Sequence, residues 1–173
     1  MRRAAPVLAV LCAVAAFPSA AAQDGTPDAA PAPAKQNWFD DPFFRVSAGL
    51  PGCPEPEGPF YTAEERRVQI HSRLERGTSC WLAGKCTDSN AYRYDKPLAP
   101  KVRTALKAVP GLHGASVWVM IQRRWVYLQG CVPSPALGRK LERAARALPD
   151  VEAVVPDLMV GTRGKPPYPV AGR

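Results

Sequence analysis

Residues 115–132, ASVWVMIQRRWVYLQGCV, predict a β-hairpin whose two strands meet at a tight turn over residues 122–124. A period of two carried by β-branched and aromatic side chains is typical of strands. One face of this hairpin would carry Val117, Val119, Ile121, Val126 and Leu128, and the other Trp118, Met120, Trp125, Tyr127 and Cys131. Because both faces carry large apolar groups, each must be covered by another part of the chain.

A helix is expected on each side of the hairpin. Apolar residues recur at three- and four-residue spacing within 98–109, and a second stripe of this kind lies within 137–148. Ser134 is placed to cap the second helix, with Pro135 at its first helical position.

Residues 151–160, VEAVVPDLMV, predict a third strand. Val154, Leu158 and Val160 fit its inward face. Pro156 indicates either an edge position or a bulge, because proline cannot donate to a strand ladder.

The N-terminus has the layout of a secretory signal peptide over residues 1–22. Arg2 and Arg3 precede a short apolar run, and alanines favour cleavage near Ala22/Gln23. The alternative is a buried N-terminal helix, which would not explain the arginines and alanines together. The bias toward Ala, Pro and Arg suggests a GC-rich bacterial genome, and therefore a periplasmic protein.

Four cysteines follow this segment: Cys53, Cys80, Cys86 and Cys131. An even number in an exported chain predicts two disulfides, for which three pairings are possible. None of the cysteines forms a CxxC pair, so we expect no metal site.

Residues 23–37 are rich in Pro and Ala, which predicts a disordered linker. The aromatic segment 38–44, WFDDPFF, either docks on its own domain or anchors the chain to a membrane or partner. Asp40 and Asp41 within it are interpreted as surface charges.

Thr62 and Glu65 form a capping-box pattern ahead of a helix expected over residues 63–76. This helix has several arginines and only a narrow apolar stripe. It is interpreted as a surface helix, with a basic face toward anionic lipid as the alternative.

Residues 97–160 resemble a BON domain, a module of bacterial periplasmic proteins. The resemblance rests on the hairpin pattern Val117-x-Val119-x-Ile121, on Leu128-Gln129-Gly130-Cys131-Val132, and on Val154, Leu158 and Val160. It implies an α+β two-layer sandwich of order αββαβ, with two helices on one side of a three-stranded sheet. Gly130, which has no side chain, would let a helix approach closely.

Two positions depart from the family pattern. Arg123-Arg124 stands where the hairpin turn usually has Asp-Gly or Asn-Gly, so we expect a different turn type or a longer turn. Asp150 replaces a usual glycine, although Asp tolerates left-handed geometry better than most residues.

In the BON arrangement Cys131 points away from the helices. We therefore favour a Cys53–Cys131 disulfide that staples a mostly irregular or helical extension over the open face, with a local Cys80–Cys86 bond. The expected divisions are a signal peptide (1–22), linker (23–37), Cys-rich extension (38–96), BON-like domain (97–160) and flexible tail (161–173).

The sequence has no Ser/His/Asp arrangement, nucleophile elbow, phosphate loop or metal-ligand cluster, so we expect no enzyme and no cofactor. The net charge of +8, reduced by two when Arg2 and Arg3 are removed, suits an anionic surface. Export argues against nucleic acid as a partner, and the oligomeric state is not predicted.

The resemblance implies a module that binds phospholipid surfaces or envelope proteins. The alternative is a structural or interaction subunit of a periplasmic or secretion assembly. The candidate partner-binding residues are Arg123, Arg124, Trp125, Trp118 and Tyr127, with a solvated turn as the alternative for the tip.

Overall fold

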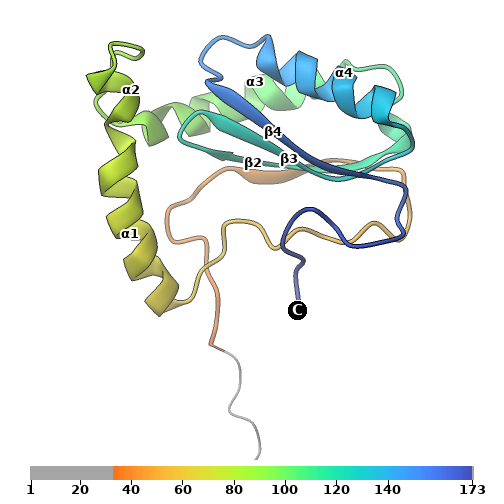
Figure 1. Ribbon diagram of the computed structural model, residues 1–173, viewed down its shortest axis with the longest axis horizontal. Coiled ribbons are helices and arrows are strands. Elements are labelled where there is room, and N and C mark those ends of the chain that lie inside the picture. The colour runs from red at the N-terminus through yellow and green to blue at the C-terminus, as the bar shows by residue number, and fades with distance from the viewer. Residues whose placement is uncertain (1–32, 173) are drawn as a thin grey trace, which may run out of the picture. The chain divides into compact units, whose positions relative to one another are not determined.

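The computed structural model describes residues 33–172 of the chain, with a four-stranded sheet of order β1-β2-β3-β4. The strands are β1 (Phe43–Ala48), β2 (Ser116–Gln122), β3 (Trp125–Val132) and β4 (Ala153–Val160). The helices are α1 (Ala63–Gly77), α2 (Ser79–Leu82), α3 (Asp95–Lys107) and α4 (Pro135–Arg146), with 3-10 turns η1 (Ala91–Tyr94) and η2 (Leu112–Gly114). Figure 1 shows α3 and α4 together on one face of the sheet.

The predicted hairpin is present. β2 and β3 pair antiparallel, from Ser116 opposite Cys131 to Gln122 opposite Trp125, and β4 runs parallel to β3. Parallel pairing needs a crossover connection, which α4 supplies. The expected α+β fold with the order helix–strand–strand–helix–strand is therefore confirmed.

The two helices bury the valine face of the hairpin. The core includes Leu98, Val102, Leu106, Val117, Val119, Ile121, Val126, Leu128, Leu137, Leu141, Ala145 and Val154. Leu158 packs partly buried against it, but Val160, which the pattern placed inward, is 53% exposed at the end of an edge strand. Pro156 lies on the same edge strand, where a missing N–H is tolerated.

β1 adds a fourth strand to the three that the resemblance implied. It pairs antiparallel with β2, with Phe43 opposite Met120 and Ala48 opposite Ser116. A register shift between Arg45 and Ser47 interrupts the period of two from which strands are recognised in a sequence.

The aromatic segment 38–44 docks on its own domain. Trp38 Nε1 donates to the Tyr61 carbonyl at 2.6 Å, and the Phe39 ring meets the Tyr61 ring edge-on with centroids 6.2 Å apart. Of the two alternatives, docking is the one observed.

The second face of the sheet is covered by the extension and by the C-terminal segment, which lie beneath it in Figure 1. Cys131 is fully buried on this face and is bonded to Cys53, and Cys80 is bonded to Cys86. These are the pairings favoured from the sequence.

The C-terminal segment takes part in this cover, although its composition suggested a flexible tail over residues 161–173. Tyr168 is buried, and its hydroxyl donates to the Pro54 carbonyl at 2.8 Å. Pro56 and Val170 form an antiparallel bridge flanked by backbone hydrogen bonds.

Gly130 is required by the hairpin and not by a helix. Its φ is 128°, and a Cβ at this position would collide with the backbone carbonyl of Ser116 and meet the Trp118 ring at 3.2 Å. The expectation that Gly130 admits a helix is therefore wrong, since the element that approaches it is β2.

The capping box of α1 is present. The Thr62 hydroxyl accepts from the Glu65 N–H at 3.2 Å, and the Glu65 carboxylate accepts from the Thr62 N–H at 2.8 Å. The predicted signal peptide, and the linker as far as residue 32, lie outside the described residues. Among residues 33–172, no helix has the length and apolar character needed to cross a membrane.

We expect the Cys53→Ala/Cys131→Ala variant to lose about 4 kcal/mol of unfolding free energy, because the broken bond closes a long loop. The residues it joins are 78 positions apart, whereas Cys80 and Cys86 are 6 apart. Cys80→Ala/Cys86→Ala is therefore the matched control, with an expected loss of about 2 kcal/mol. Urea denaturation followed by tryptophan fluorescence measures both. Equal losses would contradict the assignment of Cys53–Cys131 as the main staple.

Candidate functional site

The hairpin tip is held by one buried carboxylate. Asp95, the first residue of α3, is 2% exposed and accepts from the backbone N–H groups of Arg123 and Arg124, each at 2.7 Å. Both arginines have positive φ, 55° and 66°, and Gln122 pairs with Trp125 across them. The turn is therefore a two-residue turn of the primed type. The expectation of another type or a longer turn is wrong, because Asp95 holds two non-glycine residues in the left-handed region.

Burial raises the pKa of the Asp95 carboxyl to about 6, although the two N–H donors act in the opposite direction. Asp41 raises it further, and Arg73 lowers it. The group is ionised at neutral pH, where each of its oxygens accepts one turn N–H, and it takes up a proton under mildly acidic conditions.

The side chains of the two turn arginines bind the chain's own extension. Arg123 donates to the Ser79 hydroxyl at 3.3 Å and lies over the Trp125 ring. Arg124 donates to the Asp150 carbonyl at 2.8 Å and to the Lys85 carbonyl at 3.3 Å. Together they attach the segment around α2 to the tip of the hairpin.

The five candidate partner-binding residues do not form an exposed aromatic surface. Trp118 is buried, with the Arg45 guanidinium 4.4 Å from its ring centroid. Arg123, Arg124, Trp125 and Tyr127 are half-buried. The indole N–H of Trp125 is buried and has no hydrogen-bond partner within residues 33–172.

A second buried carboxylate, Asp41, was missed by the sequence analysis, which interpreted it as a surface charge. Its two oxygens accept from the two Nη atoms of Arg73 at 2.8 Å, and Gln122 Nε2 donates to it at 2.7 Å. The Arg73 guanidinium also lies over the rings of Phe39 and Tyr92. This pair orients α1, which packs through an arginine instead of its apolar residues.

The apolar residues of α1 consequently face solvent. Val68 is 66% and Leu74 73% exposed, and Ile70 is also exposed. The sequence predicted a narrow apolar stripe on this helix, and the Asp41–Arg73 pair decides which way that stripe points.

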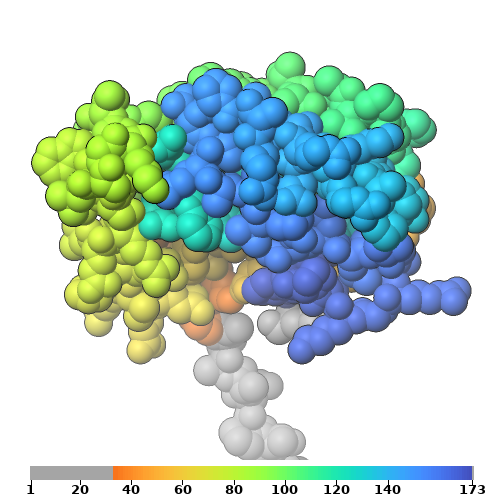
Figure 2. Space-filling view, turned by 45° about the horizontal axis from the view of Figure 1, so that its top comes forward, coloured from red at the N-terminus to blue at the C-terminus, as the bar shows by residue number. Residues whose placement is uncertain are grey.

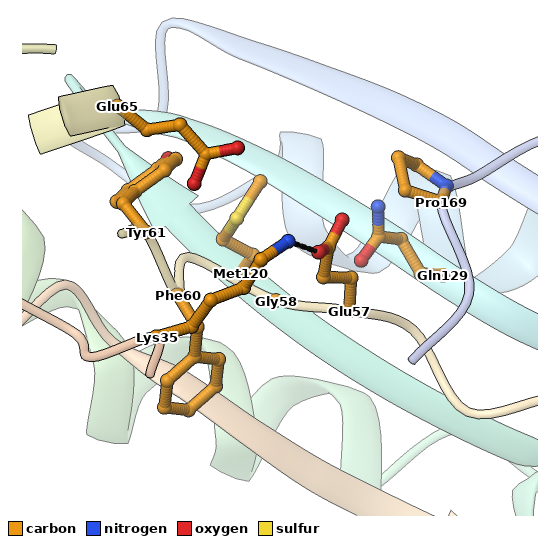
Figure 3. A pocket seen from close by; sticks show the side chains of 9 residues that line it. All are labelled: Lys35, Glu57, Gly58, Phe60, Tyr61, Glu65, Met120, Gln129 and Pro169. Atoms are coloured by element: carbon orange, nitrogen blue, oxygen red, sulfur yellow. Dashed lines mark hydrogen bonds and ion pairs between the residues drawn. The ribbon is translucent and has the colours of Figure 1, made fainter. Parts of the chain in front are cut away.

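Figure 3 shows a cavity of ≈ 240 Å³ on the face of the sheet away from α3 and α4. It is lined by Lys35, Glu57, Gly58, Phe60, Tyr61, Glu65, Met120, Gln129 and Pro169. Lys35 pairs with Glu57. The Glu65 carboxylate accepts from the Thr62 N–H in the helix cap, and this hydrogen bond lowers the pKa of Glu65. Gln129 Oε1 is buried there without a partner among the described residues. The cavity has room for water, but both of its carboxylates are already engaged.

The outer surface of the layer formed by α3 and α4, here called the helix layer, is strongly basic. The two helices carry eight cations: Lys96, Lys101, Arg103, Lys107, Arg139, Lys140, Arg143 and Arg146. Lys96 and Lys101 pair with Asp40 and Asp150. Arg103 is half-buried and lies over the Phe44 ring of β1. The same helices carry two acidic residues: Asp95, which is buried, and Glu142, which pairs with Arg146 at 2.6 Å. Figure 2 shows the two helices side by side on this face, α4 in blue and α3 in green.

The cations of α4 project away from the core because its leucines face the sheet. Arg139, Arg143 and Arg146 follow the spacing of one helix ridge, opposite Leu137 and Leu141. Within the described part of the chain, no ion pair involves Arg139, Lys140, Arg143 or Lys107. The helix layer therefore presents a surface suited to anionic groups.

Within residues 33–172 there is no free thiol and no metal-ligand group. All four cysteines there are in disulfides. No three His, Cys, Asp or Glu side chains between residues 33 and 172 are grouped so as to hold a metal ion.

Comparison with models of protein families identifies a BON domain over residues 94–162. This segment contains α3, the hairpin, α4 and β4, and it leaves out β1, α1, α2 and the C-terminal segment. Comparisons with curated proteins and with solved structures find no significant match.

Replacing Asp95 should destabilise the hairpin. We expect Asp95→Ala to lower the unfolding free energy at pH 7 by about 2 kcal/mol or more, because it leaves two N–H donors of a strained turn without an acceptor. Asp40→Asn, which removes the charge of an exposed carboxylate paired with Lys96 and keeps a residue that tolerates the positive φ of this position, is the control and should change stability by less than about 1 kcal/mol. Chemical denaturation measures both. A loss no larger for Asp95→Ala than for Asp40→Asn would contradict the assigned role.

The raised pKa of Asp95 also predicts a pH dependence. Between about pH 4 and pH 6 the folded chain keeps a proton that the unfolded chain releases, so this group's contribution to stability falls as pH rises. We expect the unfolding free energy of the wild type, relative to Asp95→Asn, to decrease across this window. Carboxyl ¹³C titration should place the Asp95 midpoint near 6. A midpoint below 4 would rule out the effect.

Proposed function

Residues 94–162 of this chain are a BON domain, and from this premise we propose that the protein binds the anionic phospholipid surface of the bacterial envelope. BON domains bind phospholipids or membrane-associated partners and are in general not enzymes. The observation that carries the proposal is the group of four cations on α3 and α4 that are in no ion pair within the described residues: Lys107, Arg139, Lys140 and Arg143.

The strength of this attraction follows from the position of the cations. A Lys or Arg near an anionic membrane contributes about 1 kcal/mol, and the effect declines within a Debye length. Arg139, Arg143 and Arg146 lie on one ridge, so they can approach a flat surface together. Guanidinium groups also donate two parallel hydrogen bonds to a phosphate, the group that an anionic phospholipid headgroup presents.

An exported location supports the same function. Residues 1–22 have the pattern of a signal peptide for export, and the two disulfides suit an oxidising compartment such as the periplasm. We place the protein at the envelope on these grounds. The role that we propose for it there is binding, which is the role of BON domains in general.

A double substitution in the helix layer tests the proposal. We expect Arg139→Gln/Arg143→Gln to weaken binding to vesicles containing phosphatidylglycerol by about 30-fold, because two contributions of about 1 kcal/mol are lost. Arg163→Gln/Lys165→Gln removes the same charge from exposed positions outside the helix layer and is the matched control. Vesicle flotation at low and high salt measures the affinity, which should fall with ionic strength.

Equal losses in the two variants would show that net charge, and not the helix layer, sets the affinity. Equal binding to neutral phosphatidylcholine vesicles would exclude recognition of anionic lipid. If the wild type binds no vesicle at all, the phospholipid proposal fails and the alternative is an envelope protein as partner, in a structural or interaction role.

A further inference from the structure

The short loop closed by the Cys80–Cys86 disulfide, sequence CWLAGKC, exposes apolar side chains. Cys80 is buried at its base, whereas Trp81 is 48% and Leu82 72% exposed. Ala83, Gly84 and Lys85 are exposed as well. Exposing a tryptophan and a neighbouring leucine to water costs free energy, which is recovered when an apolar partner covers both side chains.

This disulfide loop is fixed at the edge of the helix layer. The Arg124 guanidinium donates both to Lys85 in the loop and to Asp150 just beyond α4, and Asp150 also pairs with Lys101 of α3. Arg123 donates to Ser79 at the start of α2. In Figure 2 the segment containing α2 lies at the edge of the face formed by α3 and α4.

The loop also has internal restraints that keep its tip in place. The Lys85 N–H donates to the Cys80 carbonyl at 2.8 Å, and the Gly84 N–H to the Trp81 carbonyl at 2.9 Å. Gly84 has a φ of 67°, which closes the turn. Together with the disulfide, these bonds reduce the entropy that would be lost on inserting the tip.

We propose that the disulfide loop is a membrane anchor, in which Trp81 and Leu82 enter the lipid interface while the helix layer binds the headgroups. The inference rests on the proposed phospholipid function and names the part of the chain that inserts. Tryptophan is favoured at the boundary between headgroups and acyl chains, where one side of its ring system is wet and the other apolar.

The charges around the disulfide loop favour an anionic lipid surface as its partner. No acidic residue lies between Arg76 and Thr87, and Lys85 is an exposed cation in the same loop as the apolar pair. An apolar group flanked by cations and continuous with a basic surface has the composition of an element that lies in an anionic interface. The paired arginines of the hairpin thereby acquire a role, because they hold this loop beside the helix layer.

Binding to vesicles containing phosphatidylglycerol tests the anchor. We expect Trp81→Ser/Leu82→Ser to weaken binding by about tenfold or more, because the lost transfer of apolar surface exceeds the ~1.4 kcal/mol of a tenfold change. Val68→Ser/Leu74→Ser removes at least as exposed a pair from α1, which runs away from the helix layer in Figure 1, and should bind as the wild type does. Trp81→Phe retains an apolar ring and should keep most of the affinity.

A depth measurement provides a second readout. Lipids brominated near the headgroup end of the acyl chain should quench the fluorescence of the wild type on binding, and Trp81→Phe should lose this quenching although it remains bound. Circular dichroism and thermal unfolding establish that each variant is folded.

The outcomes separate the two proposals. If wild-type binding depends on Arg139 and Arg143 but neither affinity nor quenching depends on Trp81, the anchor is overturned and the phospholipid function stands. If the wild type binds no vesicles, both fail. Concentration-dependent dimerisation that is lost in Trp81→Ser/Leu82→Ser, without an effect on vesicle binding, would overturn the anchor and assign the loop to contact with a second copy.

Discussion

The arrangement of the whole molecule depends on the Asp95 carboxylate and the two backbone N–H groups of the hairpin turn. Two consecutive arginines with positive φ cost of order 1–3 kcal/mol each unless their surroundings compensate. The pair of 2.7 Å hydrogen bonds compensates, and it ties the first residue of α3 to the tip of β2 and β3. With the turn fixed, the side chains of Arg123 and Arg124 point to the extension and hold α2 and the disulfide loop in position.

Both faces of the sheet are used for stability, and this constrains where binding can occur. The helix layer covers the valine face, and the extension with its Cys53–Cys131 bond covers the face that carries Trp118. The aromatic residues of the hairpin are therefore part of the structure and not a docking surface. We assign binding to the outside of the helix layer and to the disulfide loop at its edge, where the unpaired cations and the exposed Trp81 lie.

Much of the fold follows from local patterns. Alternation in residues 115–132 is enough to predict the hairpin. The position of Cys131 in this alternation is enough to place its side chain on the face opposite the valines. The remaining errors have a common origin. β1 contains a register shift that hides its alternation, and the C-terminal segment is ordered by Pro54 and Pro56, which lie more than one hundred residues away.

The sequence by itself determined the class of fold, the likeness to the BON family and the two helical stripes, because periodicity is a local property of the chain. It favoured one of three disulfide pairings, and the structure has that pairing. Only the tertiary structure decided which charges are buried. Asp41 was interpreted as a surface charge and Asp95 drew no prediction, yet each is enclosed by donors from distant segments. The same distant contacts turned Arg123 and Arg124 toward the segment around α2. Packing between distant segments therefore decided which of these charged groups are buried.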